Sequence, residues 1–161
     1  MEQITVTVLG VGNILLQDEG FGVRVIEEMT RRFSFPPYVQ VLDGGTLGME
    51  LLRFLDGTEK LILVDAIAGG QPPGTLYQFY NDEVTAYFKE KVSAHELGIQ
   101  DVLAVLGVLE QPISEMVVLG VEPESLAVSL DLTDTVASQV GATIELIINQ
   151  LQAWQVEVTS L

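Results

Sequence analysis

Short runs of apolar and β-branched residues alternate along the chain with segments whose apolar residues recur every three or four positions. The runs predict strands at 4–9, 39–42, 60–64, 76–80 and 115–121. The longer spacing and its boundary signals predict helices at 20–33, 47–55, 94–110 and 136–154. This order predicts an α/β fold of three layers, in which helices flank a twisted, mostly parallel sheet of five strands with one antiparallel edge strand.

The lengths and apolar content of these segments fit one domain. A chain of 161 residues is typical of a single α/β unit, so we expect one domain over 1–161 with its core at about 4–154. Residues 60–64 are almost wholly apolar, which favours a central strand buried on both faces. The pattern Ser93-x-x-Glu96 predicts the start of the third helix, and Thr133 is a candidate cap for the last.

The charge balance narrows the range of partners. The net charge is −16, from 23 acidic and 7 basic residues, which disfavours nucleic acids and anionic membrane surfaces. No run approaches the roughly 20 apolar residues of a membrane span, and the first residues lack the basic character of a signal peptide. We therefore expect a cytoplasmic protein, and a monomer. The absence of cysteine excludes disulfides and a thiol nucleophile.

Acidic residues follow the first three predicted strands. Asp18 and Glu19 lie after the first strand, Asp43 ends the second and Asp65 ends the third. Because parallel strands end at the same edge of a sheet, we expect these carboxylates to gather where α/β folds bind ligands. Like charges a few ångströms apart repel by roughly 1–4 kcal/mol per pair, which favours a cation between them.

His95 is the single histidine and is a candidate metal ligand. It would be the second residue of its helix, where the helix dipole favours neutral imidazole, the form that binds metal. With Glu19 and Asp65 it would form a mixed oxygen and nitrogen site suited to zinc, nickel, cobalt or iron.

Structural roles are also open for the same residues. Asp18 could simply complement the following helix, and Asp43 before two glycines is a common turn residue. A histidine near a helix start is often a structural donor rather than a ligand. The aromatic residues Tyr77 and Tyr80 are interpreted as edge packing.

Several familiar motifs are incomplete. Residues 10–15 read GVGNIL, so the third glycine of the dinucleotide-binding pattern is absent. The chain contains no P-loop, no GxSxG nucleophile elbow and no HExxH zinc motif. These patterns leave a nucleotide-binding α/β protein as an alternative resting only on Gly10-x-Gly12.

Five ordered motifs resemble the hydrogenase maturation endopeptidases, which process the large subunit of nickel–iron hydrogenases. The resemblance covers about residues 4–150. The motifs are GVGNILLxDEGFGV at 10–23, LDGGT at 42–46, VDA at 64–66, SxHxLG at 93–98 and GVEPESL at 120–126.

The resemblance implies a function and roles for named residues. Such enzymes remove a C-terminal extension from the large-subunit precursor after nickel insertion, and their Glu, Asp and His that recognise the nickel fall here on Glu19, Asp65 and His95. Asp43 matches a further acid that matters for processing. The implied metal is nickel supplied by the substrate, with cadmium or zinc as substitutes in crystals. The implied chemistry is that of an aspartyl-type peptidase, with direct attack by water.

Two further points depend on this resemblance. Ala94 and Glu96 flank His95 where relatives often have Pro and Gln, a departure that leaves the ligand intact. The glycines at 10 and 12 would let the backbone turn so that Glu19 points over the sheet edge. A non-enzymatic docking factor for the precursor is the second alternative.

Overall fold

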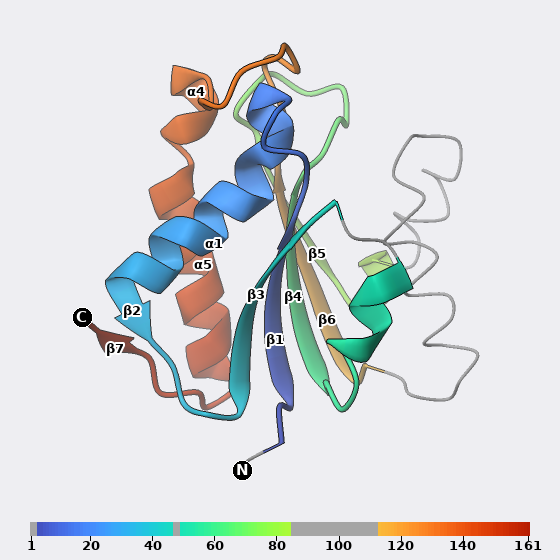
Figure 1. Ribbon diagram of the computed structural model, residues 1–161, viewed down its shortest axis with the longest axis vertical. Coiled ribbons are helices and arrows are strands. Elements are labelled where there is room, and N and C mark those ends of the chain that lie inside the picture. Colours follow the sequence, from blue (N-terminus) through green and yellow to red (C-terminus); the bar gives the residue numbers. More distant parts are fainter. Residues whose placement is uncertain (1–2, 47–48, 85–112) are drawn as a thin grey trace.

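The computed structural model describes residues 3–46, 49–84 and 113–161. Its centre is a five-stranded sheet in the order β3-β1-β4-β6-β5 (Figure 1). The strands are β1 (Val6–Val11), β3 (Val39–Gly45), β4 (Lys60–Ala66), β5 (Leu76–Tyr80) and β6 (Glu115–Val121). β5 runs antiparallel to β6 and the other pairs are parallel, which confirms the predicted sheet and its antiparallel edge strand.

Helices lie on both faces of this sheet. The helices α1 (Phe21–Arg32) and α5 (Val140–Ala153) cover one face, and the 3-10 helix η2 (Met49–Arg53) lies on the other (Figure 1). A second 3-10 helix, η1 (Gln17–Gly20), leads directly into α1. The helix expected at 94–110 lies outside the described residues, and so do the first two residues of the helix expected at 47–55.

The apolar core forms two clusters, one on each side of the sheet. The cluster beneath α1 and α5 includes Phe21, Met29 and Ile147, each with no exposed surface. The opposite cluster includes Leu51 and Leu61, which are also fully buried. The central strand β4 contributes to both clusters, as its nearly continuous apolar sequence predicts, because both of its faces are covered.

The first strand extends two residues beyond its predicted end, through Gly10 and Val11. A side chain at Gly10 would collide with the carbonyl oxygen of Gly22 in α1. The glycine therefore allows the helix to pack closely against the strand, and the strand continues where an interruption had been expected. This close approach fixes the position of the segment that follows β1.

The last predicted helix is divided in two. A short helix, α4 (Asp134–Ala137), is separated from α5 by Ser138 and Gln139, and the Gln139 amide makes a tighter, turn-type bond to the carbonyl oxygen of Val136. The Gln139 side chain donates to the carbonyl oxygen of Gly74 at 2.7 Å, so a contact with a distant loop accompanies the break. The apolar spacing continues across the break, which explains why the sequence predicts one helix.

A small second sheet pairs β2 (Phe33–Ser34) with β7 (Thr159–Ser160) in antiparallel fashion. The sequence does not predict this pairing, because two-residue strands carry no periodic signal. It fastens the end of α1 to the C-terminal segment. Within the described ranges, no helix combines the length and hydropathy that a bilayer crossing requires.

Candidate active site

The segment after β1 brings Glu19 to the carboxyl edge of the sheet. Gly12 adopts φ +132°, a conformation that side chains strongly disfavour, and a Cβ atom there would collide with the carbonyl oxygen of Glu19. The chain therefore folds back tightly between β1 and η1, with the Glu19 backbone against Gly12. This supports the interpretation that the glycine serves the placement of Glu19.

Asp65 reaches the same glycine from the end of β4. Its Oδ1 atom lies 3.7 Å from the position that a Cβ atom of Gly12 would occupy, and the same oxygen accepts a hydrogen bond from the Ala66 amide at 2.8 Å. Asp65 is 5% exposed, whereas Glu19 is half-buried. The Glu19 backbone and the Asp65 carboxylate, which are far apart in the sequence, thus both lie close to Gly12.

Asp43 lies beside this pair on the neighbouring strand. Gly10 pairs with Asp43 in the sheet, and the Gly12 amide donates to the carbonyl oxygen of Gly45 at 2.8 Å. The exposed Asp43 carboxylate accepts a bond from the Gly45 amide at 2.9 Å, a local contact typical of turns, although Asp43 itself lies within β3. Asp43 also borders a hollow of about 320 Å³. The hollow is lined by Gly12, Asn13, Ile14, Leu15, Val23, Asp43, Gly45 and Thr46.

Asp18 has a structural role of a kind that the sequence does not predict. Its carboxylate is fully buried and accepts bonds from the amides of Glu124, Ser125 and Thr133 and from the Thr133 hydroxyl group. Asp18 does not cap a helix. The Thr133 hydroxyl group donates to Asp18 and does not cap α4. With four donors already bound, Asp18 is a poor candidate for sharing an ion with Glu19 and Asp65.

Glu122 is a buried acid that sequence reasoning missed. It follows β6 and accepts bonds from the amides of Gly69 and Gln71 and from the Tyr77 hydroxyl group at 2.5 Å. Tyr77 is therefore more than edge packing, although its ring also stacks on Phe79. Glu122 belongs to the motif at 120–126, which was the one available signal for it.

Burial, together with the bond to Glu122 and its negative charge, raises the pKa of Tyr77 to about 12. All these influences favour the neutral phenol, which can donate its proton to the carboxylate. The interaction holds the loop that follows Asp65, because the Gly69 and Gln71 amides bind the same carboxylate. Glu122 thus supports the Asp65 side of the site.

The third predicted ligand, His95, lies outside the described residues. In the part of the chain that the structure describes, no group of three or more His, Asp or Glu residues is placed to hold a metal ion. Glu19 and Asp65 alone would supply two carboxylates, a donor set that fits a divalent transition ion when an imidazole completes it. The described residues thus contain only part of the proposed ligand set.

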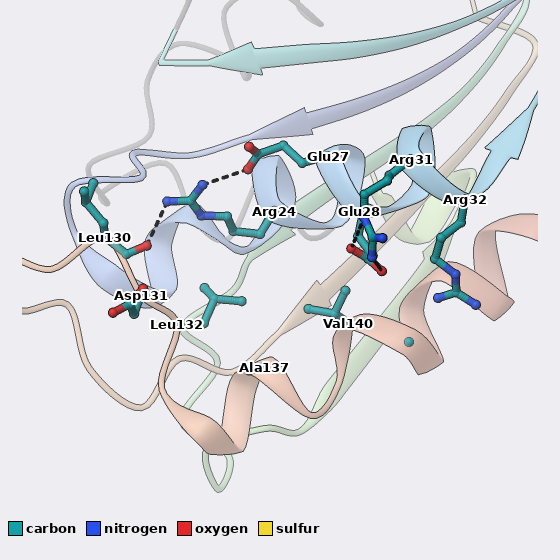
Figure 2. A pocket seen from close by; sticks show the side chains of 11 residues that line it. Arg24, Glu27, Glu28, Arg31, Arg32, Leu130, Asp131, Leu132, Ala137 and Val140 are labelled. Atoms are coloured by element: carbon teal, nitrogen blue, oxygen red, sulfur yellow. Dashed lines mark hydrogen bonds and ion pairs between the residues drawn. The ribbon is translucent and has the colours of Figure 1, made fainter.

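A larger hollow, of about 770 Å³, lies between α1 and the segment formed by residues 130–132, α4 and α5 (Figure 2). Arg24, Arg31 and Arg32 line it together with the acids Glu27 and Glu28. Glu19, Asp43 and Asp65 do not line it. Its cations and anions pair locally, as Arg24 does with Glu27 at 2.8 Å, so the hollow has no marked charge of its own.

The sequence of the chain is similar to known proteases. A family model described as "Hydrogenase maturation protease" matches residues 23–150. The hydrogenase 2 maturation protease of Escherichia coli is 42% identical over 153 residues, which cover 94% of this chain and 93% of that relative. The hydrogenase expression/formation protein HupD of Rhodobacter capsulatus is 42% identical over 156 residues, 96% of this chain and 74% of that protein.

Comparison with solved structures identifies similar proteins as well. The solved structure of the hydrogenase maturating endopeptidase HybD from E. coli superimposes with a TM-score of 0.91 at 40% identity, covering 98% of both chains. The agreement extends over the five-stranded sheet and its flanking helices. By sequence and by fold, the chain belongs to the hydrogenase maturation protease family and is a peptidase.

Proposed function

We propose that this peptidase removes the C-terminal extension from the large-subunit precursor of a nickel–iron hydrogenase after nickel has been inserted. Glu19, Asp65 and His95 would contact the nickel that the precursor carries. The observation that carries this proposal is that the Glu19 backbone and a carboxylate oxygen of Asp65 both lie close to Gly12. Carboxylates of these two residues, which come from separate segments of the chain, would suit a divalent ion that arrives with the substrate.

The chemistry of the site favours hydrolysis by water. The chain has no cysteine and a single histidine, and it lacks a nucleophile elbow, so the usual covalent nucleophiles are not provided. A water oxygen would attack the scissile carbonyl carbon, the C–N bond would break, and the leaving amine would take a proton. Contact between the nickel and the three side chains would hold the scissile peptide in place, which lowers the entropic part of the barrier.

Asp43 would assist this attack. One of its oxygens accepts the Gly45 amide, which fixes the orientation of the carboxylate, and the side chain borders the hollow at the sheet edge. In this proposal the second oxygen orients the attacking water. Asp43 would then affect the rate of cleavage more than the recognition of nickel.

The alternative of a nucleotide site fits this geometry poorly. Gly12 lies close to the Glu19 carbonyl oxygen and to Oδ1 of Asp65, both of which are hydrogen-bond acceptors. A phosphate group requires N–H donors or cations at such a glycine. Acceptor oxygens at this position would repel it.

The test is cleavage of purified precursor by Glu19→Gln, Asp65→Asn and His95→Ala variants. Each variant should cleave nickel-loaded precursor at least about 100-fold more slowly, because the peptide is no longer held in place. Glu157→Gln, which alters an exposed acid, is the matched control and should cleave normally. The wild-type protein should leave nickel-free precursor intact. Normal cleavage by all three variants would contradict the proposal.

A further inference from the structure

We propose that Leu15, Leu126, Val128 and Leu130 form a docking surface for the large-subunit precursor, referred to here as the apolar ledge. This inference rests on the proposed function and adds the place where the protein substrate binds. The four side chains are 57%, 51%, 87% and 57% exposed. Isolated exposed apolar residues are ordinary, but a concentration of them marks an interaction surface.

The exposed apolar residues are concentrated in two segments. The structure has six large hydrophobic side chains that are strongly exposed among the described residues, and four of them form the ledge. The other two, Tyr80 and Leu161, lie on β5 and at the C-terminus. The chain has a net charge of −16 and 23 acidic residues. A cluster of exposed apolar side chains is therefore unusual on its surface.

Backbone hydrogen bonds join the two segments of the ledge. The Ser129 amide donates to the Leu15 carbonyl oxygen at 3.1 Å, and the Gln17 amide donates to the Ser129 carbonyl oxygen at 3.0 Å. Leu16 and Ser129 form an isolated parallel bridge. Leu15 and residues 126–130 therefore belong to one continuous surface, although they are far apart in the sequence.

The ledge is held in place from beneath by two charged side chains. The buried Asp18 carboxylate binds the amides of Glu124 and Ser125. Arg24 donates to the Leu130 carbonyl oxygen at 2.7 Å, as the dashed line in Figure 2 shows. A surface fixed in this way loses little conformational entropy when a partner covers it, which favours binding.

The position of the ledge identifies its occupant. Leu15 lines the same hollow as Asp43, so the ledge is continuous with the candidate active site. Asp18, which precedes Glu19 in η1, also binds the ledge segment through the amides of Glu124 and Ser125. A protein substrate whose scissile peptide reaches Asp43 and Asp65 would cover the ledge with its own surface, whereas a free metal ion or a short peptide tail would not require it.

The experiment compares cleavage kinetics of the wild-type protein and the double variant L126S/V128S, using nickel-loaded large-subunit precursor. Both residues are exposed, so the fold should be kept. We expect KM to rise roughly tenfold or more, because two buried apolar contacts are lost, with kcat within about twofold of the wild-type value. Leu161→Ser is the matched control, since Leu161 is 78% exposed at the C-terminus, and it should change neither constant.

Two outcomes would overturn the inference. A KM within about twofold of the wild-type value would show that the precursor does not cover these residues. Loss of self-association with unchanged KM would assign the ledge to a second copy of the chain. Failure of the proposed function is distinguishable, because Glu19→Gln would then cleave normally while the ledge variants could still bind weakly.

Discussion

The Asp18 carboxylate accepts two hydrogen bonds from Thr133, one from its backbone amide and one from its hydroxyl group, both at 2.9 Å. The two residues are 115 positions apart in the chain. This contact, with the bonds from Glu124 and Ser125, fastens the loop after β6 to the turn that carries Glu19. The residue beside the proposed nickel ligand thus determines how that turn is held.

Replacing Asp18 should destabilise the fold. Asp18→Asn substitutes an amide for a buried acceptor, so some of the four donors face an NH₂ group and lose their partner. We expect the free energy of unfolding to fall by about 2–4 kcal/mol, measured by urea titration. Asp131→Asn alters an exposed acid of the same loop and should change stability by less than about 0.5 kcal/mol. Equal effects of the two substitutions would contradict this role of Asp18.

Gly12 should tolerate no side chain. Gly12→Ala places a Cβ atom against the Glu19 carbonyl oxygen at a φ of +132°. The expected loss of stability is about 2 kcal/mol or more, and cleavage of the precursor should fall with it, because the Glu19 backbone is displaced. The measurement is thermal unfolding combined with a cleavage assay.

Gly141→Ala is the control for this substitution. Gly141 lies in α5, where an added Cβ atom meets no other atom within 4 Å. Alanine favours the helix, so stability should rise by about 0.5–1 kcal/mol with normal cleavage. A Gly12→Ala protein that is as stable and active as Gly141→Ala would refute the close packing at Gly12.

Tyr77 should ionise late when the pH is raised. Its pKa is about 12 in the folded protein, against an ordinary value of 10.0, so the unfolded chain loses this proton first. The contribution of Tyr77 to stability is therefore complete below about pH 10 and is lost as the pH rises through about 12. Phenolate absorbance should show a late transition that disappears in Tyr77→Phe.

Tyr80→Phe is the comparison for this titration. Tyr80 donates to the Gln78 side chain rather than to an acid, so its removal should leave the late transition in place. Tyr77→Phe should also lower the free energy of unfolding by about 1 kcal/mol, through loss of the bond to Glu122. A late transition that persists in Tyr77→Phe would contradict the assignment.

Local patterns predict most of the sheet. The apolar run at 60–64 identifies the central strand, and the alternation at 76–80 identifies the antiparallel edge strand, because these patterns record how many faces of a strand are buried. The break between α4 and α5 is not predictable in this way. A contact between Gln139 and Gly74 accompanies it, and tertiary contacts leave no periodic signal.

The same limit applies to the site. Asp18 and Glu19 are adjacent acids, and no local feature of the sequence distinguishes their roles. Asp18 is buried because its carboxylate accepts hydrogen bonds from the loop at 124–133. The role of Glu122 is equally unpredictable from the sequence, because its hydrogen-bond donors lie more than 40 positions away in the chain. In contrast, Asp43 and Asp65 are predictable, since the ends of parallel strands converge by topology.

The most direct test of the account is a crystal structure of the protein grown with cadmium, with the ion located by its anomalous scattering. We predict one ion bound by carboxylate oxygens of Glu19 and Asp65 and by a ring nitrogen of His95, at the edge where Gly12 joins the two acids. An ordered His95 on another face of the molecule, with the ion bound elsewhere, would contradict the account.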